Sequence, residues 1–279
     1  MTDDLRGGAL HGEHVLLGAS FSAAEHADVA RVGSYALESA QECDAILADL
    51  TGAAYLLVSG PDAPRFCSAV FAGKELAVGE TALEAVLNGT GELISTPLLT
   101  RTGDGEYVVI DASPRQDALV AWVRFLAQTS SGGQAAFPDL VIEDATSMLV
   151  PLLLSGPAAA PVLEDYLHDG AALPPAGEVA QLRLDSIATV VAHVAVAFAP
   201  PAYLVLVPVG AARVLWRSLL SFTEVAPVGH DRIAADLRNA FPWFGSELEG
   251  GPTQMGRSEL ERWGVVRAGS DFVGARALD

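Results

Sequence analysis

Two stretches of this chain share one pattern, and that repeat restricts the fold more than any other feature. Residues 56–61 and residues 152–157 both read Leu-Leu, one further aliphatic residue, and then Ser-Gly-Pro. The apolar run suits a buried strand, glycine permits a tight reversal, and proline is tolerated in the first turn of a helix because its missing N–H would be unpaired there. The repeat predicts two related strand–turn–helix units, unless the match is a coincidence between segments rich in alanine and proline.

The segments around the repeat mix strand and helix patterns. A Thr-Gly-Asp-Gly turn at residues 102–105 lies between two apolar runs and predicts a β-hairpin. Residues 117–128, 210–220 and 231–240 carry apolar residues at helical spacing, with Val214 among those expected to face inward. Because strands and helices do not alternate strictly, the sequence predicts an α+β fold.

The longest apolar stretch, residues 190–209, could suggest a membrane span. Pro200 and Pro201 lie in its middle, and both flanking runs are rich in β-branched residues. Two buried strands joined by a turn therefore explain it better than a transmembrane helix. Residues 1–8 have neither the basic start nor the apolar core of a signal peptide, so we expect a cytoplasmic protein that does not enter a membrane.

Charge and cysteine content argue against several classes of function. The formal net charge is −19, which would repel a phosphate backbone, so nucleic acid is not an expected partner. Cys43 and Cys67 form no CxxC pair, and His11 and His14 have no matching carboxylate pattern. Neither a metal site nor a disulfide framework is indicated, and the two cysteines are expected to be small buried apolar residues or, alternatively, reactive thiols.

Several short motifs occur in an order that is similar to one known family. Asp49-Leu50-Thr51 precedes the first repeat and its Gly-Pro-Asp-Ala turn, and residues 271–278 read Asp-Phe-Val-Gly-Ala-Arg-Ala-Leu near the end of the chain. Between them lie Leu87-Asn88 with Gly91 and Arg101, Asp236-Leu237-Arg238, and Phe244-Gly245 with Glu247-Leu248. Together these motifs resemble the glycine-cleavage T-protein (aminomethyltransferase) family over residues 49–278.

The resemblance implies a fold. The expected architecture is that of the folate-binding part of the aminomethyltransferases, with two interleaved α/β domains around a central pocket. Residues 1–44 with 138–240 would form the first domain, and residues 45–137 with 241–279 the second. The family's C-terminal β-barrel is not expected, since the sequence ends where that barrel would begin.

The resemblance also implies catalytic positions. In the aminomethyltransferases an acid lies beside the folate amine and can stabilise cationic character during transfer. The family motif places Ser95 and Thr96 at the two acidic positions, and a hydroxyl carries no charge at neutral pH. We hypothesise that Asp111, where the family usually has Asn, supplies a replacement carboxylate; the alternative is that Asp111 is only a turn or cap residue.

Other residues are candidates for cofactor binding. The resemblance points to Asn88, to Tyr203 and to Arg238, which could meet a carboxylate in bidentate fashion or form an ordinary ion pair. Trp243 could stack on a planar ligand or belong to an aromatic core. The family's second acid would fall near residues 199–201, where proline offers neither charge nor donor.

Two histidines are open to two interpretations each. His193 lies in an apolar run, where a histidine is either part of the core or a base. His230 precedes a predicted helix and could face the pocket or cap the helix.

Three functional hypotheses follow. The first is a divergent aminomethyltransferase-like enzyme acting on a small amine or one-carbon-bearing substrate, with tetrahydrofolate as a candidate cofactor. The second is a folate-independent enzyme of a specialised pathway on the same scaffold. The third is a non-catalytic binding or partner subunit, completed by a second protein subunit or by a homo-oligomer.

Overall fold

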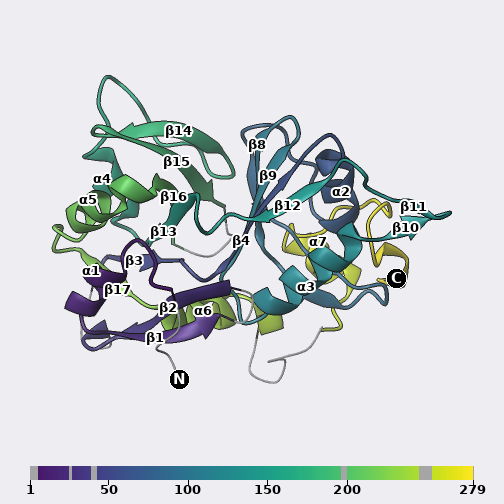
Figure 1. Cartoon of the computed structure of the whole chain (residues 1–279), viewed down its shortest axis with the longest axis horizontal. Coiled ribbons are helices and arrows are strands. Elements are labelled where there is room, and N and C mark those ends of the chain that lie inside the picture. The colour runs from purple at the N-terminus through teal and green to yellow at the C-terminus, as the bar shows by residue number, and fades with distance from the viewer. Residues whose placement is uncertain (1–5, 25–26, 39–42, 196–199, 245–252, 279) are drawn as a thin grey trace. The chain divides into compact units, whose positions relative to one another are not determined.

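The computed structural model describes residues 6–24, 27–38, 43–195, 200–244 and 253–278. The chain divides into two compact units, each made of two separate stretches (Figure 1). Unit 1 is Met1–Ala53 with Ala145–Asp236, and unit 2 is Ala54–Asp144 with Leu237–Asp279. Ala199, Gly245, Glu247 and Leu248, which contributed to the sequence motifs, lie outside the described residues.

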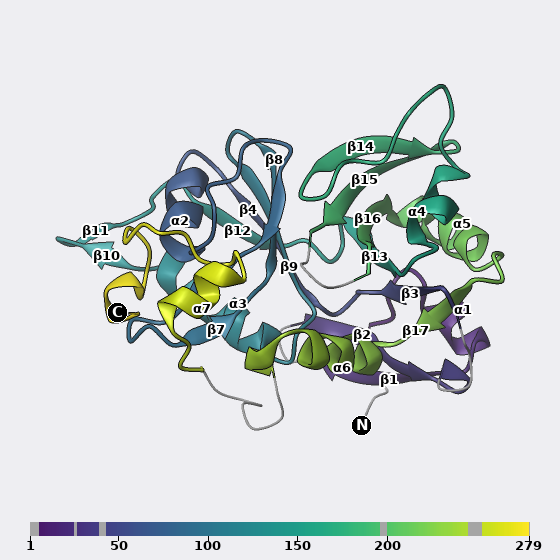
Figure 2. The ribbon, with the colours of Figure 1, turned by 180° about the vertical axis from the view of Figure 1, so that it is seen from behind.

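Unit 1 contains a six-stranded sheet in the order β14-β15-β16-β13-β3-β17 and a separate β1-β2 ribbon. Its strands are β1 (Ala19–Ala24), β2 (Ala27–Tyr35), β3 (Ala45–Asp49), β13 (Leu149–Ser155), β14 (Val179–Leu184), β15 (Ile187–Val194), β16 (Ala202–Pro208) and β17 (Val225–Val228). The pairs are antiparallel except for β17, which lies parallel to β3 at one edge of the sheet (Figure 2).

The helices of unit 1 are α1 (His11–Leu16), α4 (Ala159–Glu164), α5 (Val209–Leu219) and the larger part of α6 (His230–Ala240). Helices α4 and α5 pack on the six-stranded sheet, and α1 contacts β1 of the ribbon. Helix α5 buries Leu215, Trp216 and Leu219 against the apolar side chains of the sheet. The prediction that Val214 faces inward is wrong, because this residue is 59% exposed. It lies about 100° around the helix from Leu215, outside the buried stripe.

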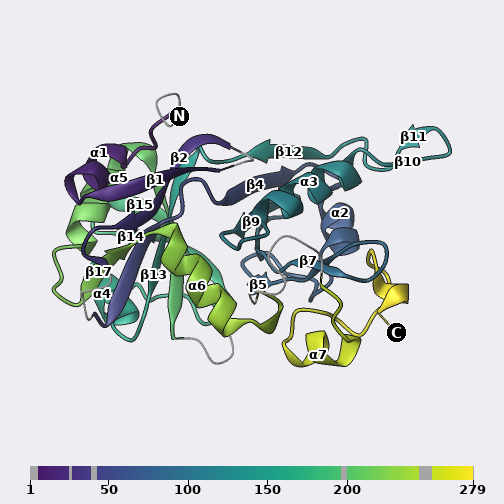
Figure 3. The same cartoon turned by 90° about the horizontal axis from the view of Figure 1, so that it is seen from below.

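Unit 2 contains a five-stranded antiparallel sheet in the order β12-β4-β9-β8-β5 and two short ribbons, β6-β7 and β10-β11. Helices α2 and α3 lie against β4 and β9 (Figure 3). The strands are β4 (Ala54–Ser59), β5 (Thr81–Leu83), β6 (Val86–Leu87), β7 (Leu93–Ser95), β8 (Leu98–Gly103), β9 (Glu106–Asp111), β10 (Ser130–Ser131), β11 (Gln134–Ala135) and β12 (Val141–Asp144). The helices are α2 (Ala63–Val70), α3 (Gln116–Ala127), the 3₁₀ turn η2 (Pro242–Phe244), α7 (Arg257–Arg262) and the 3₁₀ turn η4 (Ala275–Ala277).

The sequence repeat is confirmed as a structural repeat, once in each unit. The first copy is β4 followed by α2, and the second is β13 followed by α4. Gly60 and Gly156 turn the chain with φ of +107° and +137°, a backbone region that favours glycine. A Cβ at Gly60 would lie 2.1 Å from the main-chain oxygen of Asp139, and one at Gly156 would lie 2.3 Å from that of Asp44. The reversal therefore needs glycine for both its dihedral angle and its space.

The mixed α+β fold and the interpretation of the long apolar stretch are confirmed. The stretch forms the antiparallel strands β15 and β16. No helix within the described ranges is long and apolar enough to cross a bilayer.

We predict that Gly60→Ala lowers the free energy of unfolding by about 1–3 kcal/mol, because alanine is strained at this positive φ and its Cβ meets a main-chain oxygen. Urea denaturation followed by tryptophan fluorescence measures the change. Gly89→Ala is the matched control in the same unit, since no heavy atom lies within 4 Å of a Cβ there. Equal stability of the two variants would contradict the requirement for glycine.

Candidate functional site

Two strand ends in unit 2 bring Ser95 and Asp111 together. Asp111 ends the central strand β9, opposite Ala54 of the neighbouring strand β4, and Ser95 ends β7. Ser95 Oγ donates a hydrogen bond of 2.6 Å to Asp111 Oδ2, and the N–H of Ser113 donates one of 2.8 Å to Oδ1. Asp111 is 4% exposed and Ser95 is fully buried. The hypothesised replacement carboxylate is thus in contact with Ser95, one of the two residues that the sequence resemblance aligns with the family's acidic positions.

Ser113 extends this pair into a hydroxyl chain. Its Oγ lies 3.1 Å from Ser95 Oγ, and either hydroxyl can be the donor. The same Oγ accepts a hydrogen bond from the N–H of Arg115. Because Ser113 follows Asp111 by two residues, the carboxylate bonds to its own turn, as Asp commonly does. Ser95 can therefore donate to Asp111 or to Ser113 after a hydroxyl rotation.

Arg115 holds the surrounding main chain in place. Its Nη1 donates to the carbonyl of Leu93 at 3.0 Å, and its Nη2 donates to the carbonyl of Trp243 at 2.7 Å and to Thr253 Oγ1. Burial lowers the pKa of the Arg115 guanidinium, while the negative charge of Asp111 opposes that shift. A guanidinium nonetheless stays protonated in proteins, so a positive charge lies beside Asp111.

Thr96 and Trp243 form a second contact in the same unit. Trp243 Nε1 donates to Thr96 Oγ1 at 3.0 Å. The indole of Trp243 is fully buried and packs against Phe241 and Trp263, with ring centroids 5.1 Å and 5.4 Å away. Of the two interpretations of Trp243, the structure supports membership of an aromatic core.

Asn88 and Arg238 lie in a turn and in a helix, respectively. Asn88 follows β6 and organises its own turn: its Oδ1 accepts the N–H groups of Thr90 and Glu92, and its Nδ2 donates to Glu92 Oε2. Arg238 lies in the last turn of α6. Neither joins the contacts among Ser95, Asp111 and Ser113 that are described above.

Tyr203 lies in unit 1, in β16, and packs in the core of that unit. Its ring stacks on His193 with a centroid distance of 4.4 Å, and burial raises the pKa of the Tyr203 hydroxyl. His193 Nδ1 lies 3.1 Å from the carbonyl oxygen of Pro174. His193 thus has the contacts of a core histidine. His230 is buried as the first residue of α6.

Sequence reasoning missed a buried polar cluster in unit 1. His14 Nε2 lies 2.8 Å from Asp49 Oδ2, and His14 Nδ1 lies 2.8 Å from the hydroxyl of Tyr35. Asp49 Oδ1 also accepts the N–H of Thr51. Burial, with the charges of Asp49 and Glu38, raises the pKa of the Tyr35 hydroxyl. Asp49 belongs to a motif that the sequence did reveal, but local spacing gave no sign that His14 would be its partner.

A buried carboxyl in unit 2 also escaped the sequence analysis. Glu84 is 1% exposed, and its carboxyl fills the space where a side chain on Gly73 would lie. Burial raises the pKa of Glu84 to about 8, against the smaller opposing effects of the Gly73 N–H and of Arg267. Burial dominates because neither carboxyl oxygen makes a hydrogen bond of good geometry with a described residue.

Comparison with known proteins decides the family. The family model described as the GCVT N-terminal domain matches residues 10–250. The chain belongs to this family. Among curated proteins no match to the sequence was found.

One solved structure supports the same fold for this GCVT-domain protein. The glycine cleavage system aminomethyltransferase T from Bartonella henselae is similar with a TM-score of 0.71 and 23% identity, covering 98% of this chain and 74% of that chain. A heterotetrameric sarcosine oxidase from Corynebacterium sp. U-96 matches with a TM-score of 0.46 and 16% identity, covering 78% of this chain and 96% of that chain. The resemblance to the T-protein and the predicted fold class are confirmed.

Metal binding finds no support in the part of the chain that the structure describes. No group of three or more His, Cys, Asp or Glu residues there is arranged to hold a metal ion.

We predict that Arg115→Lys lowers the free energy of unfolding by about 2–4 kcal/mol, because an ammonium cannot reach carbonyls and a hydroxyl on three different segments at once. Urea denaturation measures the change. Arg124→Lys, on the exposed face of helix α3, which begins directly after Arg115, is the matched control and should change stability by less than about 0.5 kcal/mol. A similar decrease in the free energy of unfolding in both variants would contradict this role of Arg115.

Glu84 predicts a pH dependence of stability. Its pKa is about 8 in the folded protein, against an ordinary value of 4.5. The folded state therefore binds more protons than the unfolded state between these values. The contribution of Glu84 to the free energy of unfolding is fully present below about pH 4.5. It falls as pH rises to about 8, at up to about 1.4 kcal/mol per pH unit.

Denaturation midpoints measured from pH 5 to pH 8 test this effect, with Glu84→Gln expected to flatten the decline because glutamine does not titrate. Glu143→Gln, exposed on β12, should leave the pH dependence as it is. A decline that persists unchanged in Glu84→Gln would contradict the assignment.

Proposed function

We propose that this GCVT-domain protein is a divergent aminomethyltransferase-like enzyme that acts on a small amine or one-carbon-bearing substrate. The observation that carries the proposal is the 2.6 Å hydrogen bond from Ser95 to Asp111. By resemblance, Ser95 stands where the aminomethyltransferases have an acid. The carboxylate of Asp111, on the neighbouring strand end, supplies the negative charge that Ser95 lacks.

The chemistry of the pair suits an amine. An ionised carboxylate only accepts hydrogen bonds, so Asp111 can orient a substrate N–H and stabilise positive charge that develops as a carbon–nitrogen bond breaks. Ser95 can release Asp111 Oδ2 by turning its hydroxyl toward Ser113, 3.1 Å away. Asp111 Oδ2 then accepts the hydrogen bond from the substrate N–H, and the orientation of the Ser95 hydroxyl decides whether Oδ2 accepts from Ser95 or from the substrate.

Arg115 supports the main chain around Asp111. Its hydrogen bonds to the Leu93 and Trp243 carbonyls keep β7 and η2 at fixed positions around the carboxylate. A catalytic group needs such support, because a small displacement from the productive geometry costs much of the rate.

Tetrahydrofolate is the cofactor we propose. When bound, it supplies the amine that carries the one-carbon unit. The described residues fit this group in their donor and acceptor chemistry, since a buried carboxylate and two hydroxyls suit a ligand rich in N–H groups. Asp111 and Ser95 are the residues proposed to hold it.

Asp111→Asn tests the proposal. We expect one-carbon transfer to fall by about tenfold to a hundredfold, because a neutral amide replaces the charge-assisted acceptor. Formation of methylenetetrahydrofolate from an aminomethyl donor measures turnover, and calorimetry with tetrahydrofolate measures binding. Asp104→Asn, an exposed acid in the turn before β9, is the matched control and should retain wild-type turnover.

The other outcomes separate the alternatives. Turnover of an amine without any heat from tetrahydrofolate would favour a folate-independent enzyme. Binding that saturates only after a second protein is added, with no turnover, would favour a partner subunit. Unchanged turnover in Asp111→Asn would overturn the role of Asp111.

A further inference from the structure

Unit 2 contains a small cavity that the proposed activity does not use. Its volume is about 130 Å³, and it lies between α2, the segment that follows α2, β8, β9 and Arg267 from the C-terminal stretch. A cavity of about 150 Å³ in another protein is large enough to hold benzene. The space is therefore suited to one small molecule.

Apolar side chains form part of its lining. Phe71, Leu76 and Leu99 are buried residues of the unit 2 core, and Cys67 lies beside them. Burial raises the pKa of the Cys67 thiol, so the sulfur is a neutral, apolar part of the wall at neutral pH.

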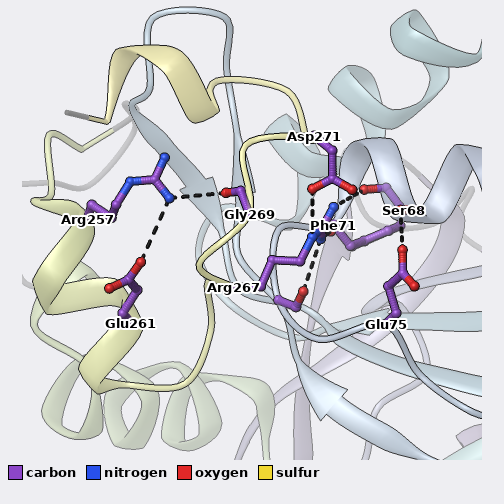
Figure 4. Close-up of polar contacts among 9 residues, drawn as sticks. Ser68, Phe71, Glu75, Arg257, Glu261, Arg267, Gly269 and Asp271 are labelled. Atoms are coloured by element: carbon purple, nitrogen blue, oxygen red, sulfur yellow. Dashed lines mark hydrogen bonds and ion pairs between the residues drawn. The ribbon is translucent and has the colours of Figure 1, made fainter.

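Three cations share the same lining. Lys74, Arg101 and Arg267 all border the cavity, although the whole chain has only 16 lysines and arginines in 279 residues. The only carboxylate among the lining residues is Glu75, which accepts a hydrogen bond from Ser68 (Figure 4). Within the lining itself the cations outnumber the carboxylate three to one. Lys74 and Arg267 have carboxylate partners outside the lining, Glu80 and Asp271, whereas Arg101 donates to main-chain carbonyls.

The two guanidinium groups are held in fixed positions. Arg267 donates to the carbonyls of Ser68 and Phe71 at 2.7 Å and 2.8 Å, and its Nε donates to Asp271 (Figure 4). Arg101 donates to the carbonyl of Leu76 at 2.8 Å, and its guanidinium lies over the Tyr107 ring. Binding here would not require either side chain to be ordered first, which removes one cost of association.

Lys74 is the adjustable cation. Its side chain is 50% exposed, and its Nζ lies 3.2 Å from Glu80. An ammonium on a flexible stem can turn from this exposed partner toward an anion in the cavity.

We propose that this cavity binds a small monocarboxylate with an apolar body. The body would occupy the space beside Phe71, Leu76 and Leu99, and the carboxylate would meet the cations at the border. Both features are needed together: the apolar wall favours the body, and the positive charge selects the anion.

Titration of the full chain with benzoate tests this proposal. We expect saturable binding of one benzoate by calorimetry, with amide NMR shifts concentrated in residues 67–76. Benzyl alcohol has a similar body without the charge, and phosphate has charge without an apolar body. Both should bind more weakly than benzoate.

Lys74→Gln should weaken benzoate binding about two- to fivefold, as expected for one partly exposed charge. Arg262→Gln is the control, because this cation lies in the same unit with a side chain that is 75% exposed and outside the cavity. Failure to saturate, equal binding of benzyl alcohol, or equal affinity of Lys74→Gln and the wild type would overturn the proposal.

Discussion

The buried guanidinium of Arg115 is the interaction on which the candidate site depends. A charge taken out of water costs several kcal/mol unless hydrogen bonds and an opposite charge offset the loss. Arg115 obtains both, from the carbonyl of Leu93, from residues 243 and 253, and from Asp111. If any one segment moved, the guanidinium would lose a partner that water could not replace. The strand ends that carry Ser95 and Asp111 are therefore held by one side chain.

Local patterns predicted those parts of the fold that depend on local chemistry. The Ser-Gly-Pro repeat, the hairpin of β8 and β9, and helices α3, α5 and α6 all follow from turn residues and apolar spacing in short windows. Val214 is a residue for which local spacing gave the wrong prediction. The sheet against which α5 packs determines which neighbour of Leu215 faces the core. The predicted domain boundaries and the roles of the site residues stay predictions.

The candidate site was partly accessible from sequence for a different reason. Asp111 was singled out because it departs from the family's usual Asn, and the structure places it against Ser95. Arg115 could not be found in this way, since two of its partners lie 128 and 138 residues along the chain. The burial of Glu84 was not predicted, because its carboxyl occupies the space left by the absent side chain of Gly73. No hydrophobic pattern in the sequence encodes that contact.

The interleaving of the two units has a consequence for how the chain folds during synthesis. Arg267 donates a hydrogen bond to the carbonyl of Ser68, which lies 199 residues earlier in the chain. The end of α2 therefore cannot form this contact until the ribosome has synthesised the whole intervening stretch. That stretch contains most of the large sheet of unit 1. Residues 54–144 must therefore leave the ribosome with part of their apolar surface uncovered. Such an order favours slow folding, and it makes the nascent chain a substrate for chaperones well before either unit is complete.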